Sequence, residues 1–324
     1  MRDVALTDPD VHVLALSPHL DDVLFSAAAV VQSRPVEVWT VFAGAPEPAV
    51  TTDWDRACGF TDSDETLAAR RTEDLLAFEG TNATVRHLPL LDGPYSDPGR
   101  RRTDLGLLAA VLGAWWDEHP AGLVIVPAGA GARVAPAFWE RLRRHSDADL
   151  LAPPAGDGAV RTGRPAPGAP HPTKRLVNLG KTTVRRLMHA DYQRRRAAAR
   201  RRGLAVNNDH LAVRDLALHL AAERWQRGDR AAVALYEDLP YLWAEPADAA
   251  VAEVARTHQL RASAVVLPID VDDKFTRIQH YASQVDVMDP VEHRLSKPGH
   301  LPTTERYWLL EPATHQPAHE GAPS

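Results

Sequence analysis

The chain has 324 residues, which is long enough for one large domain or for a domain with a substantial insertion. Its apolar share of 44% and charged share of 25% are ordinary for a soluble globular protein. Its single cysteine, Cys58, excludes an internal disulfide framework and cysteine-based zinc fingers, so a metal site would depend on carboxylates and the 15 histidines. The net charge of −6 conceals an asymmetry, because residues 130–206 hold 17 Lys and Arg against 5 Asp and Glu, while the remainder is acidic.

The chain begins without the signature of a targeting segment. The first residues, MRDVALTDPDVHVLALS, carry no basic segment ahead of a long apolar stretch, as a signal peptide would. No run approaches the roughly 20 apolar residues that are needed to span a bilayer. We therefore expect a cytoplasmic protein with no membrane partner.

The first third of the chain alternates short apolar runs with helical patterns. Strands are expected over residues 11–17, 36–44, 84–92 and 122–129. Helices are expected over residues 21–33, 62–80 and 103–119, the second ended by Gly80 and the third capped by Thr103. Strands that alternate with helices at this spacing predict βαβ units, and so an α/β fold with a Rossmann-like, mostly parallel sheet flanked by helices.

This alternation is interrupted in the middle of the chain. Residues 152–172 are rich in Pro and Gly, as loops are, and residues 181–203 have a helical and strongly basic pattern. We expect residues 130–206 to be a basic insertion, forming a lid or a homo-oligomer contact, in a single domain made of 1–129 and 207–324. After it, helices are expected over 210–226, 246–258 and 272–285, and strands over 231–240 and 263–269.

The segment SPHLDD, residues 17–22, lies where the first expected strand ends and the next helix begins. Ligands bind at the carboxyl ends of the strands in an open parallel sheet, so a site is expected here. His19 and Asp22 can both point into one crevice across a tight turn, and imidazole with carboxylate suits zinc or a similar divalent ion. Asp21 is then placed to act as a general base toward an activated water. The alternative is that Asp21 and Asp22 only cap a helix and that His19 is a surface residue.

SPHLDDVLFSAA resembles the first motif of the PIG-L/LmbE-like family of zinc-dependent N-deacetylases, in its His-Leu-Asp-Asp branch. Arg70 and Glu73 resemble the family's Arg-x-x-Glu helix, and NNDHLAVRDLAL resembles its second motif, His-x-Asp-His. Further likenesses are HLPLLDGPY (87–95), YEDLPY (236–241), HYASQ (280–284) and ERYW (305–308). The likeness covers residues 10–129 and 207–310, and the basic insertion has no counterpart.

The resemblance implies a hydrolase of N-acyl amides that binds zinc or another divalent metal. The metal ligands that it implies are His19, Asp22 and His210. Asp21 would be the general base, Arg70 matches an arginine that helps to hold the substrate, and Asp209 would support His210 from beside it. Without the resemblance, His210 would be interpreted as an ordinary residue at the start of a helix.

Two positions depart from the family pattern. Val23 replaces a Glu that often follows the paired aspartates, although the His-Leu-Asp-Asp branch tolerates an apolar residue there. Asn207 stands where the second motif usually begins with His, a residue thought to polarise the substrate carbonyl or to protonate the leaving amine. Asn can donate a hydrogen bond to an oxyanion, but it cannot transfer a proton. Acid catalysis would then fall to Asp21 alone, or to one of the insertion histidines His145, His171 and His189.

The basic stretch RRRAAARRR within the insertion allows several interpretations. It could bind nucleic acid, but Tyr192 is the one aromatic residue near it, so the stacking platform of single-strand binders is missing and we expect no nucleic-acid partner. A solvated helix face is the simplest alternative. Arginines close to the site could also select a substrate that bears phosphate or carboxylate.

The leading hypothesis is hydrolysis of an N-acyl group, typically N-acetyl, from an amino sugar or glycosylated small molecule in bacterial natural-product biosynthesis. A second hypothesis is a repurposed family member, whose metal site acts differently on an amide, ester or amine. A third is a catalytically silent binding protein, against which the complete set of ligands and base argues. A nucleotide-binding dehydrogenase is excluded because no G-x-G-x-x-G follows the first strand.

Overall fold

The computed structural model describes residues 6–132 and 205–313. The expectations for the basic insertion, namely its helix, its three histidines and its role as a lid or subunit contact, therefore lie outside the described residues. The domain boundaries at either side of the insertion stay predictions.

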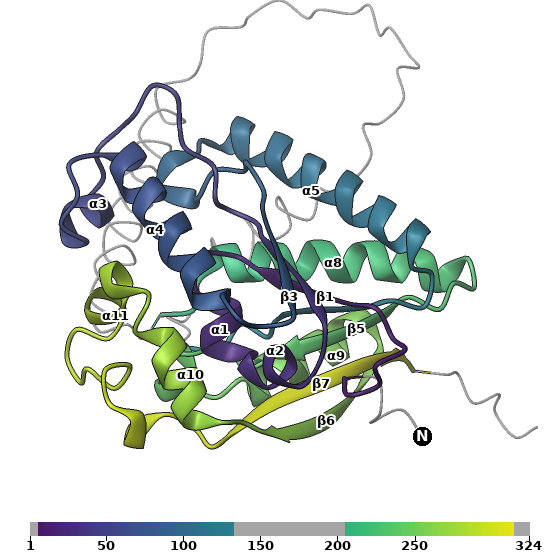
Figure 1. Cartoon of the computed structure of the whole chain (residues 1–324). Helices are drawn as coiled ribbons and strands as arrows, with labels where there is room; N and C mark the ends of the chain where they lie inside the picture. The colour runs from purple at the N-terminus through teal and green to yellow at the C-terminus, as the bar shows by residue number, and fades with distance from the viewer. Residues whose placement is uncertain (1–5, 133–204, 314–324) are drawn as a thin grey trace, which may run out of the picture. The chain divides into compact units, whose positions relative to one another are not determined.

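The described strands form one seven-stranded sheet with the order β3-β2-β1-β4-β5-β7-β6 (Figure 1). Strands β1 to β5 run parallel, whereas β7 pairs antiparallel with both β5 and β6. The strands are β1 Val13–Ser17, β2 Val36–Thr40, β3 Ala83–His87, β4 Leu123–Pro127, β5 Ala232–Tyr236, β6 Leu260–Pro268 and β7 Thr304–Pro312. The expected α/β fold with a mostly parallel sheet flanked by helices is confirmed.

Helices cover both faces of this sheet (Figure 1). The helices are α1 Asp22–Ser26, α2 Ala28–Ser33, α3 Asp53–Ala57, α4 Ser63–Phe78, α5 Pro98–Glu118, α8 Asn208–Gln226, α9 Asp248–His258, α10 Val271–Ile278 and α11 Ala282–Met288. On one face α10 contacts both α1 and α4, and α11 contacts α4, while α5 packs against α8 on the other face. Within the described residues, none of these helices has the length and hydropathy required to cross a bilayer.

Every residue of β1 and β4 is buried, as the near-continuous apolar runs predicted for strands covered on both faces. The two strands pair in parallel, with Val13, Leu14 and Ala15 opposite Leu123, Val124 and Ile125. Their carboxyl ends therefore lie side by side. The loop after β1 and the segment that follows β4 are brought to the same edge of the sheet.

Helix boundaries differ from the expectation after β1. The helix expected over residues 21–33 is divided into α1 and α2, because Ala27 leaves helical geometry with φ −135° and ψ 29°. The backbone N–H groups of Ala28 and Ala29, at the start of α2, donate to the carboxylate of Glu305 on β7 at 3.1 and 2.8 Å. This cap comes from a residue 276 positions along the chain, so no local pattern could predict the break.

Helix α5 begins earlier than the sequence suggests. Asp97 caps it by accepting hydrogen bonds from the backbone N–H groups of Gly99 and Arg100 at 2.7 and 2.9 Å. The prediction that Thr103 caps this helix is wrong, because Thr103 lies inside it and donates its hydroxyl to the Gly99 carbonyl oxygen at 3.3 Å. The helix expected over residues 272–285 is likewise two helices, α10 and α11, and the sequence did not predict α3 or β7.

Candidate metal centre

The SPHLDD segment forms a tight turn between β1 and α1. The Ser17 hydroxyl donates to the His19 carbonyl oxygen at 2.7 Å and accepts the backbone N–H of Val23 at 3.1 Å. The backbone N–H of Asp21 also donates to the His19 carbonyl oxygen, at 3.0 Å. The backbone N–H of His19 in turn donates to Asp22 Oδ2 at 2.7 Å, so the turn holds the imidazole and this carboxylate together.

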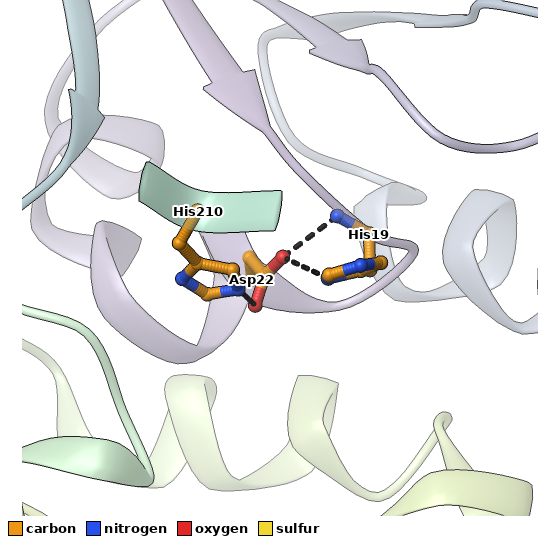
Figure 2. Close-up of side chains that lie close together, drawn as sticks. All are labelled: His19, Asp22 and His210. Carbon is orange, nitrogen blue, oxygen red and sulfur yellow. Dashed lines mark hydrogen bonds and ion pairs between the residues drawn. The ribbon is translucent and has the colours of Figure 1, made fainter. Parts of the chain in front are cut away.

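The three expected metal ligands meet at this turn (Figure 2). His19 Nδ1 lies 3.1 Å from Asp22 Oδ2, and His210 Nε2 lies 3.1 Å from Asp22 Oδ1. The two imidazole ring centroids are 5.4 Å apart. One ligand atom from each residue lies within 4.8 Å of the other two, a spacing that a single ion can bridge. The residues come from two parts of the chain, because His210 lies in the first turn of α8.

The polar atoms of this cluster fit a bound cation. Asp22 Oδ1 and His210 Nε2 are both buried, and neither has a partner with hydrogen-bond geometry in the described structure. Such unpartnered buried atoms are rare in folded proteins. Here a carboxylate oxygen and an imidazole nitrogen face each other, and these are ligand atoms that zinc and similar divalent ions prefer.

Asp238, which sequence reasoning did not assign, fixes the orientation of His210. His210 Nδ1 lies 2.6 Å from Asp238 Oδ1. Asp238 Oδ2 accepts the backbone N–H groups of Gly129 and Ala130 at 2.7 and 2.9 Å. A proton held between Nδ1 and this carboxylate leaves Nε2 available to an ion. The one signal in the sequence was the position of Asp238 within YEDLPY, a likeness that carried no role for it.

Asp209 supports His19 and not His210, beside which it was expected to act. Asp209 Oδ2 lies 3.4 Å from His19 Nε2, and Asp92 Oδ1 lies 3.5 Å from the same nitrogen. With His19 these two carboxylates also have the spacing of a second ligand group, but Arg101 of α5 forms an ion pair with Asp209. With a proton on Nε2, His19 would donate to these two carboxylates, and Nδ1 would then be the nitrogen that can bind an ion. No sequence pattern pointed to Arg101, and Asp92 stood out only as part of HLPLLDGPY.

Asp21 lies beside the three ligands without contacting an imidazole. Its Oδ2 accepts a hydrogen bond from Arg70 Nη2 at 3.2 Å, while its Oδ1 is buried and has no partner among the described residues. Burial and the adjacent Asp22 carboxylate raise the pKa of Asp21 to about 7. A carboxyl group that titrates near neutrality can both accept and return a proton. Arg70, expected to hold the substrate, thus contacts the expected base directly.

Carboxylates lie against both imidazoles of the centre and change their pKa values. Burial lowers the pKa of His210, but the Asp22 and Asp238 carboxylates more than offset it and raise the value to about 9. Burial likewise opposes the charged form of His19, yet Asp92 and Asp209 raise its pKa well above the ordinary range. The carboxylates therefore favour positive charge between them, which protons on the two rings or a metal ion can supply.

Asn207 has a structural role at the start of α8. Its Oδ1 accepts the backbone N–H of Asp209 at 2.9 Å, which caps the helix and directs the amide nitrogen the other way. Asn207 Nδ2 donates to the hydroxyl oxygen of Tyr241 at 3.4 Å. The Tyr241 ring meets the His210 ring edge-on, with centroids 5.2 Å apart. Burial and the Asp22 carboxylate raise the pKa of Tyr241. Sequence reasoning noted Tyr241 only as part of YEDLPY.

No protein-family model matches the chain, and no curated protein matches its sequence. Solved structures do match its fold. A triple mutant of a deacetylase of the teicoplanin biosynthetic pathway, Orf2, is 21% identical with a TM-score of 0.56, over 93% of this chain and 98% of that one. The zinc-inhibited form of teicoplanin deacetylase Orf2 is 20% identical with a TM-score of 0.55 over the same shares. The A40926 pseudoaglycone deacetylase Dbv21 is 21% identical with a TM-score of 0.54, over 93% and 97%.

Proposed function

We propose that this chain hydrolyses N-acyl amides, with N-acetyl groups on amino sugars or glycosylated small molecules as its substrate class. The observation that carries the proposal is the buried cluster of His19, Asp22 and His210. Beside it lies Asp21 Oδ1, for which the described part of the chain offers no hydrogen-bond partner. Metal-assisted amide hydrolysis needs this combination of open ligand set and base. The solved structures with a similar fold add support, because they are deacetylases of teicoplanin and of A40926 pseudoaglycone.

The proposed metal ligands are His19 Nδ1, a carboxylate oxygen of Asp22 and His210 Nε2. When bound, a divalent ion would act as a Lewis acid toward the amide carbonyl and would lower the pKa of water. Asp209 and Asp238 keep protons on the opposite ring nitrogens, so the two ligand nitrogens have lone pairs to offer. Zinc is the first candidate, and manganese and cobalt belong in the same test because the similar deacetylase Orf2 has a zinc-inhibited form.

Asp21 is the proposed base. Its unpartnered Oδ1 accepts one proton as water attacks the amide carbon, while Arg70 holds Oδ2 in place. The C–N bond then breaks, and Asp21 returns the proton to the leaving nitrogen. The oxygen of water ends in the released carboxylic acid, which gives up its remaining proton at neutral pH, so the products are acetate and an ammonium group.

Metal content and acetate release together test this proposal. Wild type and His210→Ala, purified identically, would be compared by elemental mass spectrometry, with about one divalent ion per chain expected in wild type and a sharp reduction in the variant. His219→Ala is the matched control, because His219 lies on the same helix with 42% of its side chain exposed. Release of acetate from N-acetylated amino-sugar glycosides would then be measured for the metal-loaded wild type.

The two readouts separate the parts of the proposal. A metal-free wild type, or a His210→Ala variant that binds metal as well as wild type does, would contradict the ligand assignment. A metal-loaded wild type that releases acetate from none of the amides would contradict the proposed activity and leave the ligand assignment intact.

A further inference from the structure

Amide hydrolysis places negative charge on the carbonyl oxygen, and a hydrogen-bond donor aimed at that oxygen accelerates the reaction. Position 207, where a histidine was expected to help, holds an asparagine that is already engaged at both ends of its amide. The hydroxyl that this amide reaches belongs to Tyr241, the residue whose ring packs on the proposed ligand His210.

The hydrogen bonds of Asn207 determine which atom of its amide faces the Tyr241 hydroxyl. Because Asn207 Oδ1 accepts the helix-capping N–H of Asp209, its Nδ2 is the atom that faces Tyr241. The Tyr241 oxygen is thus an acceptor in this contact, and its own hydrogen is left to point elsewhere. Among the described residues no acceptor is found for that hydrogen.

The Tyr241 side chain packs closely at its ring and at its Cβ. His210 meets it edge-on, at 5.2 Å between centroids and an interplanar angle of 81°. On its backbone side, a Cβ built on Gly131 would lie 3.1 Å from Tyr241 Cβ and 3.0 Å from the backbone nitrogen of Val206, so only glycine allows this approach. A donor held in advance needs little reorganisation when charge develops on a substrate.

We propose that the Tyr241 hydroxyl donates a hydrogen bond to the carbonyl oxygen of the scissile amide, and that Asn207 is the positioning residue that orients it. The inference rests on the proposed amide hydrolysis, which it deepens. The hydrogen bond strengthens as the carbonyl oxygen becomes an oxyanion, and Tyr241 keeps its proton throughout. Asp21 still carries the proton from water to the leaving nitrogen, so the balance of the reaction is unchanged.

Tyr241→Phe tests the proposal by removing one oxygen while the ring stays on His210. With p-nitrophenyl 2-acetamido-2-deoxy-β-D-glucopyranoside and any other N-acetyl amide that the wild type hydrolyses, we expect kcat to fall about 100-fold at similar KM. Metal content should be that of wild type. Tyr307→Phe is the control, because it removes another buried tyrosine hydroxyl, bound to Glu305 outside the ligand cluster, and should leave kcat unchanged.

A more reactive acyl group distinguishes a Tyr241 hydroxyl that donates to the substrate from one that only supports the structure. A trifluoroacetyl carbonyl is more electrophilic than an acetyl carbonyl, so the loss caused by Tyr241→Phe should shrink at least several-fold on the N-trifluoroacetyl analogue. An equal loss on both substrates would overturn the proposed contact.

Asn207→Ser tests the positioning role. Serine still caps α8 but is too short to reach Tyr241, so we expect a smaller fall in kcat than with Tyr241→Phe. The double variant should be no slower than Tyr241→Phe alone, because Asn207 acts through the hydroxyl that is already missing. Losses that multiply would overturn the positioning role.

The remaining outcomes distinguish this inference from the function on which it rests. An active wild type whose Tyr241→Phe variant keeps its kcat would overturn the inference alone. A metal-loaded wild type with no amidase activity would overturn the proposed function, and the role of Tyr241 with it.

Discussion

Asp21 and Asp22 are adjacent in the chain, but their contacts move their pKa values in opposite directions. Burial opposes ionisation of Asp22, but His210 and then His19 lower its pKa below the usual range. Asp21 is buried against that charge, and Arg70 is its one side-chain partner among the described residues. Its pKa is raised to about 7. One carboxylate therefore stays ionised as a ligand, while the other can change its protonation state at neutral pH.

Asp21→Asn should abolish proton transfer and spare the metal. Asparagine has the shape of aspartate and still offers an oxygen to Arg70, so the turn should keep its structure. We expect kcat to fall roughly 100-fold to 10,000-fold while metal content stays at the wild-type level. Steady-state kinetics on purified protein and elemental mass spectrometry would check this, and loss of the metal together with activity would show that Asp21 is a ligand.

Asp238→Asn should weaken metal binding without removing a ligand. Asparagine no longer offers His210 Nδ1 a charged acceptor, so the ring loses the partner that directs Nε2 toward the ion. Competition with a chromophoric chelator should show affinity reduced about 10-fold to 100-fold. Asp53→Asn, which changes a fully exposed carboxylate, is the control. An Asp238→Asn variant with unchanged metal affinity would contradict the proposed role of Asp238 in orienting His210.

At the scale of elements, Glu305 joins β7 to α2 and α10. Its carboxylate accepts the N–H groups of Ala28 and Ala29, the Lys274 ammonium at 2.7 Å and the Tyr307 hydroxyl at 2.7 Å. Lys274 is fully buried, and Glu305 is the carboxylate that pairs with it. These contacts tie α2 and α10 to the last strand of the sheet.

Glu305→Gln should destabilise the fold by about 3 kcal/mol or more, because it leaves the buried Lys274 ammonium without a counter-charge. Urea denaturation would measure the change. The double variant Glu305→Gln with Lys274→Met should recover much of the lost stability, since no charge is then left unpaired. A double variant no more stable than the single one would mean that the loss comes from the helix cap and not from the charge.

The same elements show what a sequence can and cannot predict. The alternating strands and the turn after β1 could be predicted, because periodicity is local. The grouping of His19, Asp22 and His210 could be predicted only from the family resemblance, because His210 lies far along the chain from the other two. The division of the helix over residues 21–33 could not, since its cause is a carboxylate on the last strand. Asp238 and Arg101 were missed for the same reason: each contacts a site residue brought near it only by the fold.

For the whole molecule, the candidate centre joins two distant parts of the chain. His19 and Asp209 contact each other although they are 190 positions apart in the chain. In the sequence, His19 and Asp22 precede the insertion and His210 follows it. An ion that binds all three ligands in the folded state, and fewer in the unfolded chain, stabilises the fold by mass action.

Metal removal should therefore lower the melting temperature of the wild type. At a free metal concentration about 100 times Kd the ion contributes about 2.7 kcal/mol, so calorimetry should show a fall of several degrees after chelation and recovery on adding metal back. His210→Ala should melt at one temperature with and without metal. A wild type that is insensitive to chelation would argue against an ion bound by the folded centre.

The place of β7 in the sheet has a consequence for how the protein is made. β7 lies between β5 and β6, although it follows both in the chain. On the ribosome, β5 emerges with one edge open, and β6 has no neighbour until β7 has been synthesised. Glu305, which caps α2, arrives with that same strand. Until β7 has been made, the nascent chain therefore carries an open edge on β5, an unpaired β6 and an α2 without its cap, and it is in this interval that its unpaired strand edges are most exposed to aggregation.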